Sequence, residues 1–193
     1  MAIYDQVHSE YELRELAVKV NGSEAFKHAD CVGSAEEELD VVQITKKCRG
    51  VTAKTRVKGA GTGTVTISAH VPYDLYNAIY DMSERADLVE GVEGYGNANV
   101  HKEFAMVERV FDEDGIEKLK AYPRCIMLSG PKSSIENGAE EVAELELEVS
   151  LMPDANGYCM YQCIVDTLPE GSEIQSKWMT EFTPDLVQKV VPK

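Results

Sequence analysis

Residues 61–83 combine a strand pattern of polar and apolar positions with the one convincing amphipathic helix pattern of the chain. Apolar residues occupy the odd positions from Val65 to Val71, and Thr, Ser and His occupy the even positions from Thr64 to His70. A period of two with β-branched residues predicts a half-buried strand. Pro72 ends that strand because it has no N–H to donate, and proline suits the first turn of a helix. An apolar stripe at helical spacing follows, made of Leu75, Tyr76, Ile79 and Met82.

Alternation of the same kind predicts strands elsewhere, over 14–20, 36–47, 104–111, 116–128, 143–151 and 158–165. The most regular is 143–151, where apolar residues alternate with Glu144, Glu146, Glu148 and Ser150. The turn signals at 21–22 and 112–115 predict hairpins, and 158–165 is expected to pair back on 143–151. Pro123 predicts an edge position or a bulge. We expect loops over 23–34, 81–99 and 129–138, and a short helix from Thr183 to Val190.

These elements favour a mainly β fold. About eight strands, dominant hairpins and no strand–helix–strand rhythm predict an antiparallel β-sandwich or barrel with one packed α-helix. No linker divides the chain, so we expect a single domain over 1–193 with a C-terminal extension around 170–193.

The charge is strongly acidic and unevenly distributed. The formal net charge of −15 opposes tight binding to a phosphate backbone, which requires clustered Lys and Arg. Residues 46–58 contain no acid and carry six bases, Lys46, Lys47, Arg49, Lys54, Arg56 and Lys58. Residues 51–57 form a β-capable segment between Gly50 and the glycines of 59–63, and we expect a long, mobile basic loop around 46–63. Basic and acidic patches on one molecule favour self-association, although two solvated faces on a monomer would explain the same pattern.

The remaining composition indicates a protein made in a cytoplasm. No apolar run approaches the ~20 residues that span a bilayer, and residues 1–15 lack the charged and apolar regions of a signal peptide. We therefore expect no membrane association. The five cysteines are odd in number and scattered, which favours free thiols.

The residues that could form catalytic or ligand-binding motifs do not have the spacing that such motifs require. The glycines of 59–63 lack nucleotide-loop spacing and lead into a strand, which favours a flexible hinge. Cys159 and Cys163 share a strand face, but no second Cys or His pair follows at zinc spacing, so we expect buried apolar residues. The four histidines are dispersed. We interpret the row of Glu144, Glu146 and Glu148 as a solvated, negatively charged surface. We expect no catalytic residues, no cofactor and no metal, and hence no enzyme.

The sequence resembles the major tail protein, or tail tube protein, of long non-contractile-tailed bacteriophages (siphophages) of Gram-positive hosts. The resemblance covers most of the chain. It rests on the length of 193 residues, on GTVTISAHVPYDLYNAIYDM, on the acidic EGVEGYGN that follows it, and on the ordered hairpins. The late acidic strand and the tail with Trp178 and Thr183-Pro184 complete the match.

The resemblance implies a structural virion protein located in the tail and assembled in the bacterial host cytoplasm. Proteins of that family form hexameric rings around an inner β-barrel, and the rings stack through a long loop into a tube. The genome passes through its lumen into the host without specific binding. The expected partners are copies of the chain itself and other tail proteins, namely the tape measure, terminator and distal tail proteins.

Two sets of residues follow from this implied role. A wall of carboxylates and hydroxyls repels the DNA duplex and lets it slide, so we expect the lumen to be lined by Glu144, Glu146, Glu148, Thr64, Thr66 and Ser68. Between rings, we expect the six bases of 46–58 to meet a neighbour's acidic residues, Asp81, Glu84, Asp87, Glu90 and Glu93.

Other readings of the sequence remain open at this stage. A tail terminator, a connector protein or a soluble β-sandwich binding module would share the fold class without sharing the function. A small hydrolase would need a nucleophile paired with a base, and no such pair is evident in the sequence.

Overall fold

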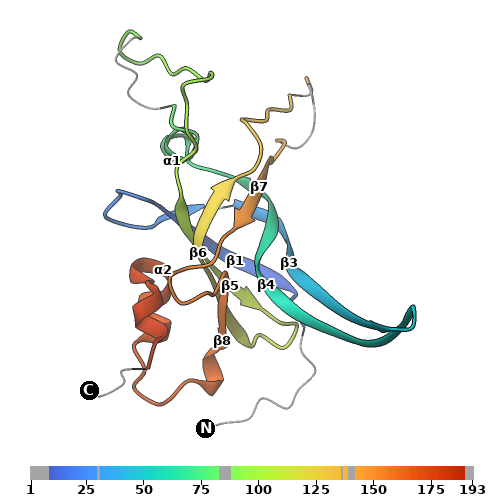
Figure 1. Cartoon of the computed structure of the whole chain (residues 1–193). Helices are drawn as coiled ribbons and strands as arrows, with labels where there is room; N and C mark the ends of the chain where they lie inside the picture. Colours follow the sequence, from blue (N-terminus) through green and yellow to red (C-terminus); the bar gives the residue numbers. More distant parts are fainter. Residues whose placement is uncertain (1–8, 30, 83–87, 136, 139–141, 190–193) are drawn as a thin grey trace.

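The computed structural model describes residues 9–29, 31–82, 88–135, 137–138 and 142–189. Eight strands form one antiparallel sheet in the order β2-β1-β5-β6-β7-β4-β3, and β8 also pairs with β6 (Figure 1). The strands are β1 (Glu12–Val20), β2 (Lys27–Ala29), β3 (Cys31–Cys48), β4 (Val51–His70), β5 (Phe104–Phe111), β6 (Glu117–Met127), β7 (Leu145–Leu151) and β8 (Tyr161–Ile164). The prediction of a mainly β, antiparallel fold with a packed helix is confirmed.

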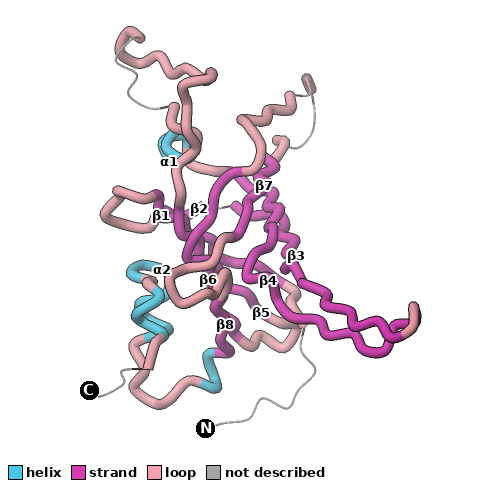
Figure 2. Tube along the Cα trace, in the orientation of Figure 1, coloured by secondary structure: helices cyan, strands magenta, loops and turns pink. Residues whose placement is uncertain are grey.

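The sheet curves until β3 approaches β1, which makes a partly open barrel (Figure 2). Its interior is filled by the apolar faces of the strands, including Leu16, Ile67, Met106 and Leu147. Helix α1 (Tyr73–Ile79) begins directly after Pro72 and packs on this core through Leu75 and Ile79. The strand, proline and helix therefore occur as the alternation predicts, because Val65, Ile67 and Ala69 are all buried.

A second core lies on the outer face of the sheet. Helix α2 (Ile174–Glu181) packs Trp178 and Met179 against Ala17, Val107 and Leu119. This helix was not expected from the sequence, because its eight residues show little apolar periodicity. The expected helix at 183–190 is a short 3₁₀ turn, η2 (Pro184–Val187), and residue 190 lies outside the described residues. Another 3₁₀ turn, η1 (Val165–Thr167), follows β8.

The prediction that β8 pairs with β7 is wrong. Residues 118–121 of β6 pair with β8, whereas residues 125–127 of the same strand pair with β7. The two strands thus follow one another along one edge of β6. Asp154 sets the intervening turn, because its carboxylate accepts hydrogen bonds from the backbone N–H groups of Asn156 and Tyr158.

The expected basic loop at 46–63 is wrong as well, because the segment consists of paired strands. β3 and β4 continue past the barrel as a long hairpin that closes at Arg49 and Gly50. The predicted loop at 23–34 in fact contains β2 and the start of β3. The predicted glycine hinge is an irregularity within β4, where Gly61 has a positive φ of 80°.

Two smaller predictions have different outcomes. The register of β5 against β6 shifts between Tyr122 and Cys125, so the bulge expected at Pro123 is confirmed. Cys159 is buried in the inner core, whereas Cys163 packs against the outer one, so they do not share a face as expected. Among the described residues, no helix is long and apolar enough to cross a membrane.

Candidate functional site

The two expected rows of lumen residues lie side by side on one face of the sheet. β4 and β7 are paired in the register Thr64↔Ser150, Thr66↔Glu148 and Ser68↔Glu146. Directly paired residues of antiparallel strands point to the same side. This side is opposite to the one that buries Val65 and Ile67.

β3 widens this surface beyond what the sequence indicated. Glu36 pairs with Thr66, and Glu38 pairs with Thr64. We call the combined surface the polar face; its members are Ser34, Glu36, Glu38, Thr64, Thr66, Ser68, Glu146, Glu148 and Ser150. The imperfect alternation of 36–47 hid the contribution of β3, because a bulge follows Leu39 and changes the register.

Lys132 partly neutralises the negative charge of the polar face. Its Nζ donates hydrogen bonds to Glu146 Oε1 at 2.8 Å and to Glu148 Oε1 at 3.0 Å. The hydrogen bond from Lys132 lowers the pKa of Glu148, which keeps that carboxylate ionised. Glu144 lies just before β7 and is exposed, and its carboxylate lies against Gly33 with no room for a Cβ there.

The hairpin gathers the basic residues through its turn and its register. Arg49 and Gly50 have φ of 52° and 81°, the pattern of a type I′ turn that matches strand twist. The pairs Lys46↔Lys54, Ile44↔Arg56 and Val42↔Lys58 follow from this turn. Because side chains alternate along strands, four of the six bases share one side of the hairpin. We call it the basic face, defined by Lys46, Lys54, Arg56 and Lys58.

The basic face lacks negative partners within the described chain. Lys46 and Lys54 are directly opposed, and like charges in this position repel each other. None of the ion pairs between described residues involves the six bases of 46–58. Exposed aliphatic side chains accompany them, among them Val41, Ile44, Val51 and Val57.

The described part of the acidic stretch, from residue 88 to residue 93, lies beside α1, at the end of the barrel away from the hairpin (Figure 1). Glu93 is held there, since its carboxylate accepts hydrogen bonds from Tyr73 Oη at 2.9 Å and Asn77 Nδ2 at 3.3 Å. Asp81 lies 3.3 Å from Lys102 Nζ. Glu90 is exposed. Glu84 and Asp87 lie outside the described residues.

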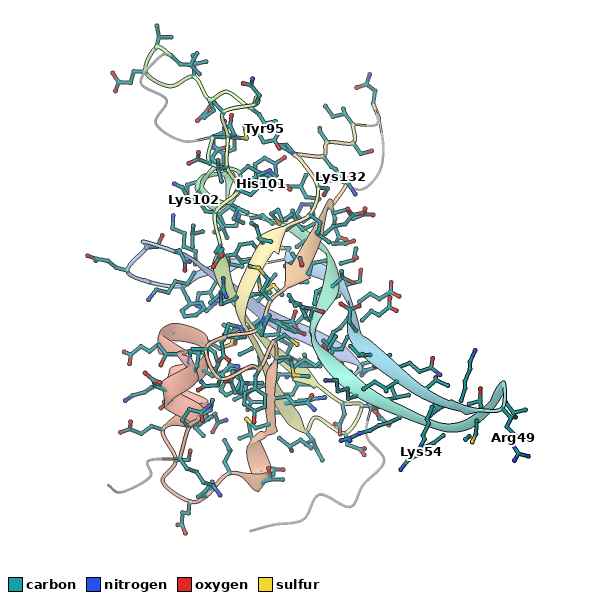
Figure 3. All side chains as sticks on the ribbon, in the orientation of Figure 1. Arg49, Lys54, Tyr95, His101, Lys102 and Lys132 are labelled. Atoms are coloured by element: carbon teal, nitrogen blue, oxygen red, sulfur yellow. The ribbon has the colours of Figure 1, made fainter. Side chains whose placement is uncertain are left out.

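Tyr95 and His101, which carry no motif in the sequence, fix this loop to the barrel. His101 Nδ1 lies 3.0 Å from the main-chain oxygen of Met127, and Nε2 lies 2.8 Å from Tyr95 Oη. A neutral imidazole satisfies both contacts by donating from Nδ1 and accepting at Nε2. Tyr95, His101 and Lys132 therefore lie at the same end of the molecule (Figure 3).

A buried polar cluster occupies the other end of the barrel interior. Glu37 Oε2 accepts hydrogen bonds from Lys120 Nζ at 2.9 Å and Tyr122 Oη at 2.8 Å. Lys120 Nζ also donates to Glu10 Oε2 at 2.8 Å. A cavity of about 650 Å³ adjoins these groups. We call Glu10, Glu37, Glu108, Lys118, Lys120 and Tyr122 the polar cluster.

Glu108 is the most buried carboxyl group of this cluster. Its residue is 2% exposed, and burial raises its pKa to about 7, even though Lys120 acts in the opposite direction. The alternation of β5 offers a signal for this position, since Glu108 falls in the same phase as Phe104, Met106 and Val110. A glutamate among predicted core positions is unusual, because ionised carboxylates are rarely buried without partners.

Several solved structures are similar to the chain. It is similar to a chain in "Cryo-EM structure of the anti-feeding prophage (AFP) baseplate, 6-fold symmetrised", with 10% identity, a TM-score of 0.44, and coverage of 84% of this chain and 100% of that one. A chain of the anti-feeding prophage tube-terminating cap gives 14% identity and a TM-score of 0.43, over 86% and 100%. Hcp1 from Flavobacterium johnsoniae gives 14% identity and a TM-score of 0.35, over 70% and 89%.

No protein-family model matches the sequence, and no curated protein matches it. Identities of 10–14% and TM-scores below 0.5 do not assign a role to this chain. Within the described residues, no group of three or more His, Cys, Asp or Glu side chains could hold a metal ion.

Proposed function

We propose that this chain is a structural subunit of a phage-type tail tube that polymerises head to tail. The observation that carries the proposal is the polarity of the molecule. The hairpin with the basic face leaves the barrel on the side away from α1, and the loop with Glu90 and Glu93 lies at the α1 end (Figure 1). Two different, complementary surfaces at opposite ends generate open stacks, because each added copy presents the same free end again.

Both surfaces carry apolar area in addition to charge. The hairpin exposes Val41, Ile44 and Val57, and the loops at the α1 end expose Val89, Val100 and Ile135. Burial of such side chains contributes about 25 cal/mol per Å², whereas each exposed ion pair contributes only about 0–1 kcal/mol. Apolar contacts would therefore supply most of the affinity, and the charges would select the orientation.

In the same proposal, copies arranged in hexameric rings turn the polar face toward a central channel. The paired hydroxyls and carboxylates of Thr66, Glu148 and Glu146 would present a wet, net negative wall to a passing duplex. The negative charge avoids the counterion release that makes DNA adhere to basic surfaces. Passage of the phage genome through this channel and assembly with the other tail proteins complete the proposed role.

Electron microscopy of the purified chain at rising concentration tests the proposal. Wild-type protein is expected to form rings or tubes. A variant with Lys54→Glu, Arg56→Glu and Lys58→Glu is expected to stay monomeric with an unchanged circular dichroism spectrum. Normal tubes from this variant would refute the docking assignment, and wild-type protein that remains monomeric at every concentration would refute the assembly itself.

A matched control separates the position of the charges from their number. Lys19, Lys177 and Lys189 lie on β1, on α2 and after η2, away from the hairpin. Reversal of these three charges to Glu changes the net charge equally, and we expect such a variant still to form tubes. Loss of assembly in both variants would mean that net charge alone governs it.

A further inference from the structure

Three carboxyl groups and one hydroxyl converge inside the polar cluster from four different segments. Tyr122 Oη, on β6, lies 2.8 Å from Glu37 Oε2 on β3 and 3.4 Å from Glu108 Oε2 on β5. Glu10, before β1, joins through Lys120. A phenol has one proton to donate, so Tyr122 cannot satisfy both carboxylates at once. Burial raises the pKa of Tyr122, which keeps that single proton in place.

Glu37 links β3 to β6, with which β3 does not pair. Among the described strands, β3 has only β4 as a backbone partner, and this pair extends outward as the hairpin. The far edge of β3 faces β1 without a ladder of hydrogen bonds between them. The contacts of Glu37 with Lys120 and Tyr122 therefore tie the root of the hairpin to the barrel wall.

Glu108 has an unmet hydrogen-bonding need. Its Oε1 is buried, and no described residue donates to it. A protonated Glu108 donates to Tyr122 Oη and leaves the phenol proton for Glu37. An ionised Glu108 needs donors of its own; the hydroxyl of Tyr122 already lies beside it, and the positive charge of Lys120 acts on it. Lys120 Nζ already serves Glu10 and Glu37.

We propose that Glu108, Tyr122 and Glu37 form a proton-controlled latch at the root of the β3–β4 hairpin. When Glu108 is protonated, the chain Glu108→Tyr122→Glu37 holds β3 against the barrel. When Glu108 releases its proton to solvent, Tyr122 turns its hydroxyl proton toward the new carboxylate. Of its two hydrogen bonds to β6, Glu37 then keeps only the one from Lys120. The root of the hairpin is therefore held less tightly against the barrel.

The surroundings place this transition near neutral pH. Burial raises the pKa of Glu108 to about 7; the positive charge of Lys120 opposes the rise and the negative charge of Glu37 adds to it. The titratable groups around Glu108 come from three sides, namely Lys118, Lys120, Tyr122 and Cys125 on β6, Glu37 on β3, and Glu10 and Tyr11 before β1 with Glu12 at its start. β4 contributes Val65 and β1 contributes Leu16, which are apolar.

Nuclear magnetic resonance of the isolated chain tests the latch. We expect the carboxyl carbon of Glu108 to titrate near pH 7 and the backbone amide of Glu37 to shift with the same midpoint. In Glu108→Gln, whose amide mimics the protonated acid, the Glu37 shift is expected to vanish. In Tyr122→Phe, Glu108 should still titrate while the Glu37 amide no longer follows. A Glu37 amide that ignores the titration of Glu108 in the wild type would overturn the proposal.

Hydrogen exchange gives a second readout that does not depend on chemical shifts. Above neutral pH, amides of 34–39 should exchange faster in the wild type than in Glu108→Gln at the same pH, and equally fast below the transition. Glu146→Gln, on the opposite face of the sheet, serves as the matched control and should behave as the wild type does. Equal exchange in the wild type and Glu108→Gln at every pH would also overturn the proposal.

A consequence for polymerisation rests on the proposed function. If the hairpin docks on a neighbouring copy, wild-type tubes should assemble less readily above neutral pH and Glu108→Gln tubes should not. The latch itself is measured on monomers, so its failure and the failure of the tube proposal are distinguishable.

Discussion

The indole nitrogen of Trp178 donates a hydrogen bond to the main-chain oxygen of Lys120 at 2.9 Å. The side chain of Lys120 points to the other side of the sheet, where its Nζ contacts Glu10 and Glu37. One residue of β6 thus joins the outer core under α2 to the polar cluster inside the barrel. A change on α2 can therefore affect the position of the root of the hairpin.

Truncation of Trp178 should be strongly destabilising. The side chain is 1% exposed and fills the outer core beside Phe182. Trp178→Ala is expected to lower the free energy of unfolding by about 3–5 kcal/mol, as large-to-small core changes do. Urea denaturation followed by circular dichroism measures this change. The control is Lys177→Ala on the same helix, and an equal loss in both variants would contradict a specific role of the indole.

The stability of the chain should depend on the charge of Glu108 with a definite sign. Its folded pKa of about 7 lies above the ordinary value of 4.5, so the folded state binds the proton more tightly. This contribution is complete below pH 4.5 and is lost as the pH rises through 7. Above pH 7, the free energy of unfolding of Glu108→Gln should therefore rise relative to that of the wild type, by up to about 3 kcal/mol.

Urea unfolding of the two proteins over a pH series measures that difference. Other acids, such as Glu148 and Asp154, have lowered pKa values and contribute in the opposite direction. Their effects cancel in the comparison because both proteins contain them. A difference that does not change between pH 5 and 8 would contradict the buried, protonatable state of Glu108.

A substitution at Arg49 tests how much the turn contributes to the stability of the hairpin. It adopts a left-handed conformation with φ of 52°, which costs an ordinary L-residue about 1 kcal/mol and costs Asn less. Arg49→Asn creates an Asn-Gly turn and should strengthen the hairpin by a few tenths to about 1 kcal/mol. Amide exchange across residues 41–58 should slow accordingly. Faster exchange would show that the turn is held by contacts of the arginine side chain.

The loop at 88–101 should depend on Glu93 for its position beside α1. Glu93 accepts two hydrogen bonds, from Tyr73 and Asn77, and no covalent link assists it. Glu93→Ala is expected to speed amide exchange in this loop while changing global stability by no more than about 1 kcal/mol. Glu90→Ala, an exposed neighbour, is the control. Unchanged exchange in Glu93→Ala would mean that His101 and Tyr95 suffice to hold the loop.

The sequence alone was sufficient for features that depend on local periodicity. The alternation of Thr64–Val71, the stop at Pro72 and the spacing of Leu75 and Ile79 determine which side of each element is apolar. The structure places those sides as predicted. The bases of 46–58 could be identified as one group in the same way, although their strand conformation could not, because β-branched residues alone do not distinguish an extended loop from a paired hairpin.

Tertiary structure decided everything that depends on which strands become neighbours. A period of two defines the faces of a strand but carries no information about its partner, so the pairing of β8 with β6 was out of reach. The same limit hid the polar cluster, since Glu37, Glu108 and Tyr122 come from separate strands. Only closure of the sheet brings these three groups together, and their shared hydrogen bond exists only in that arrangement.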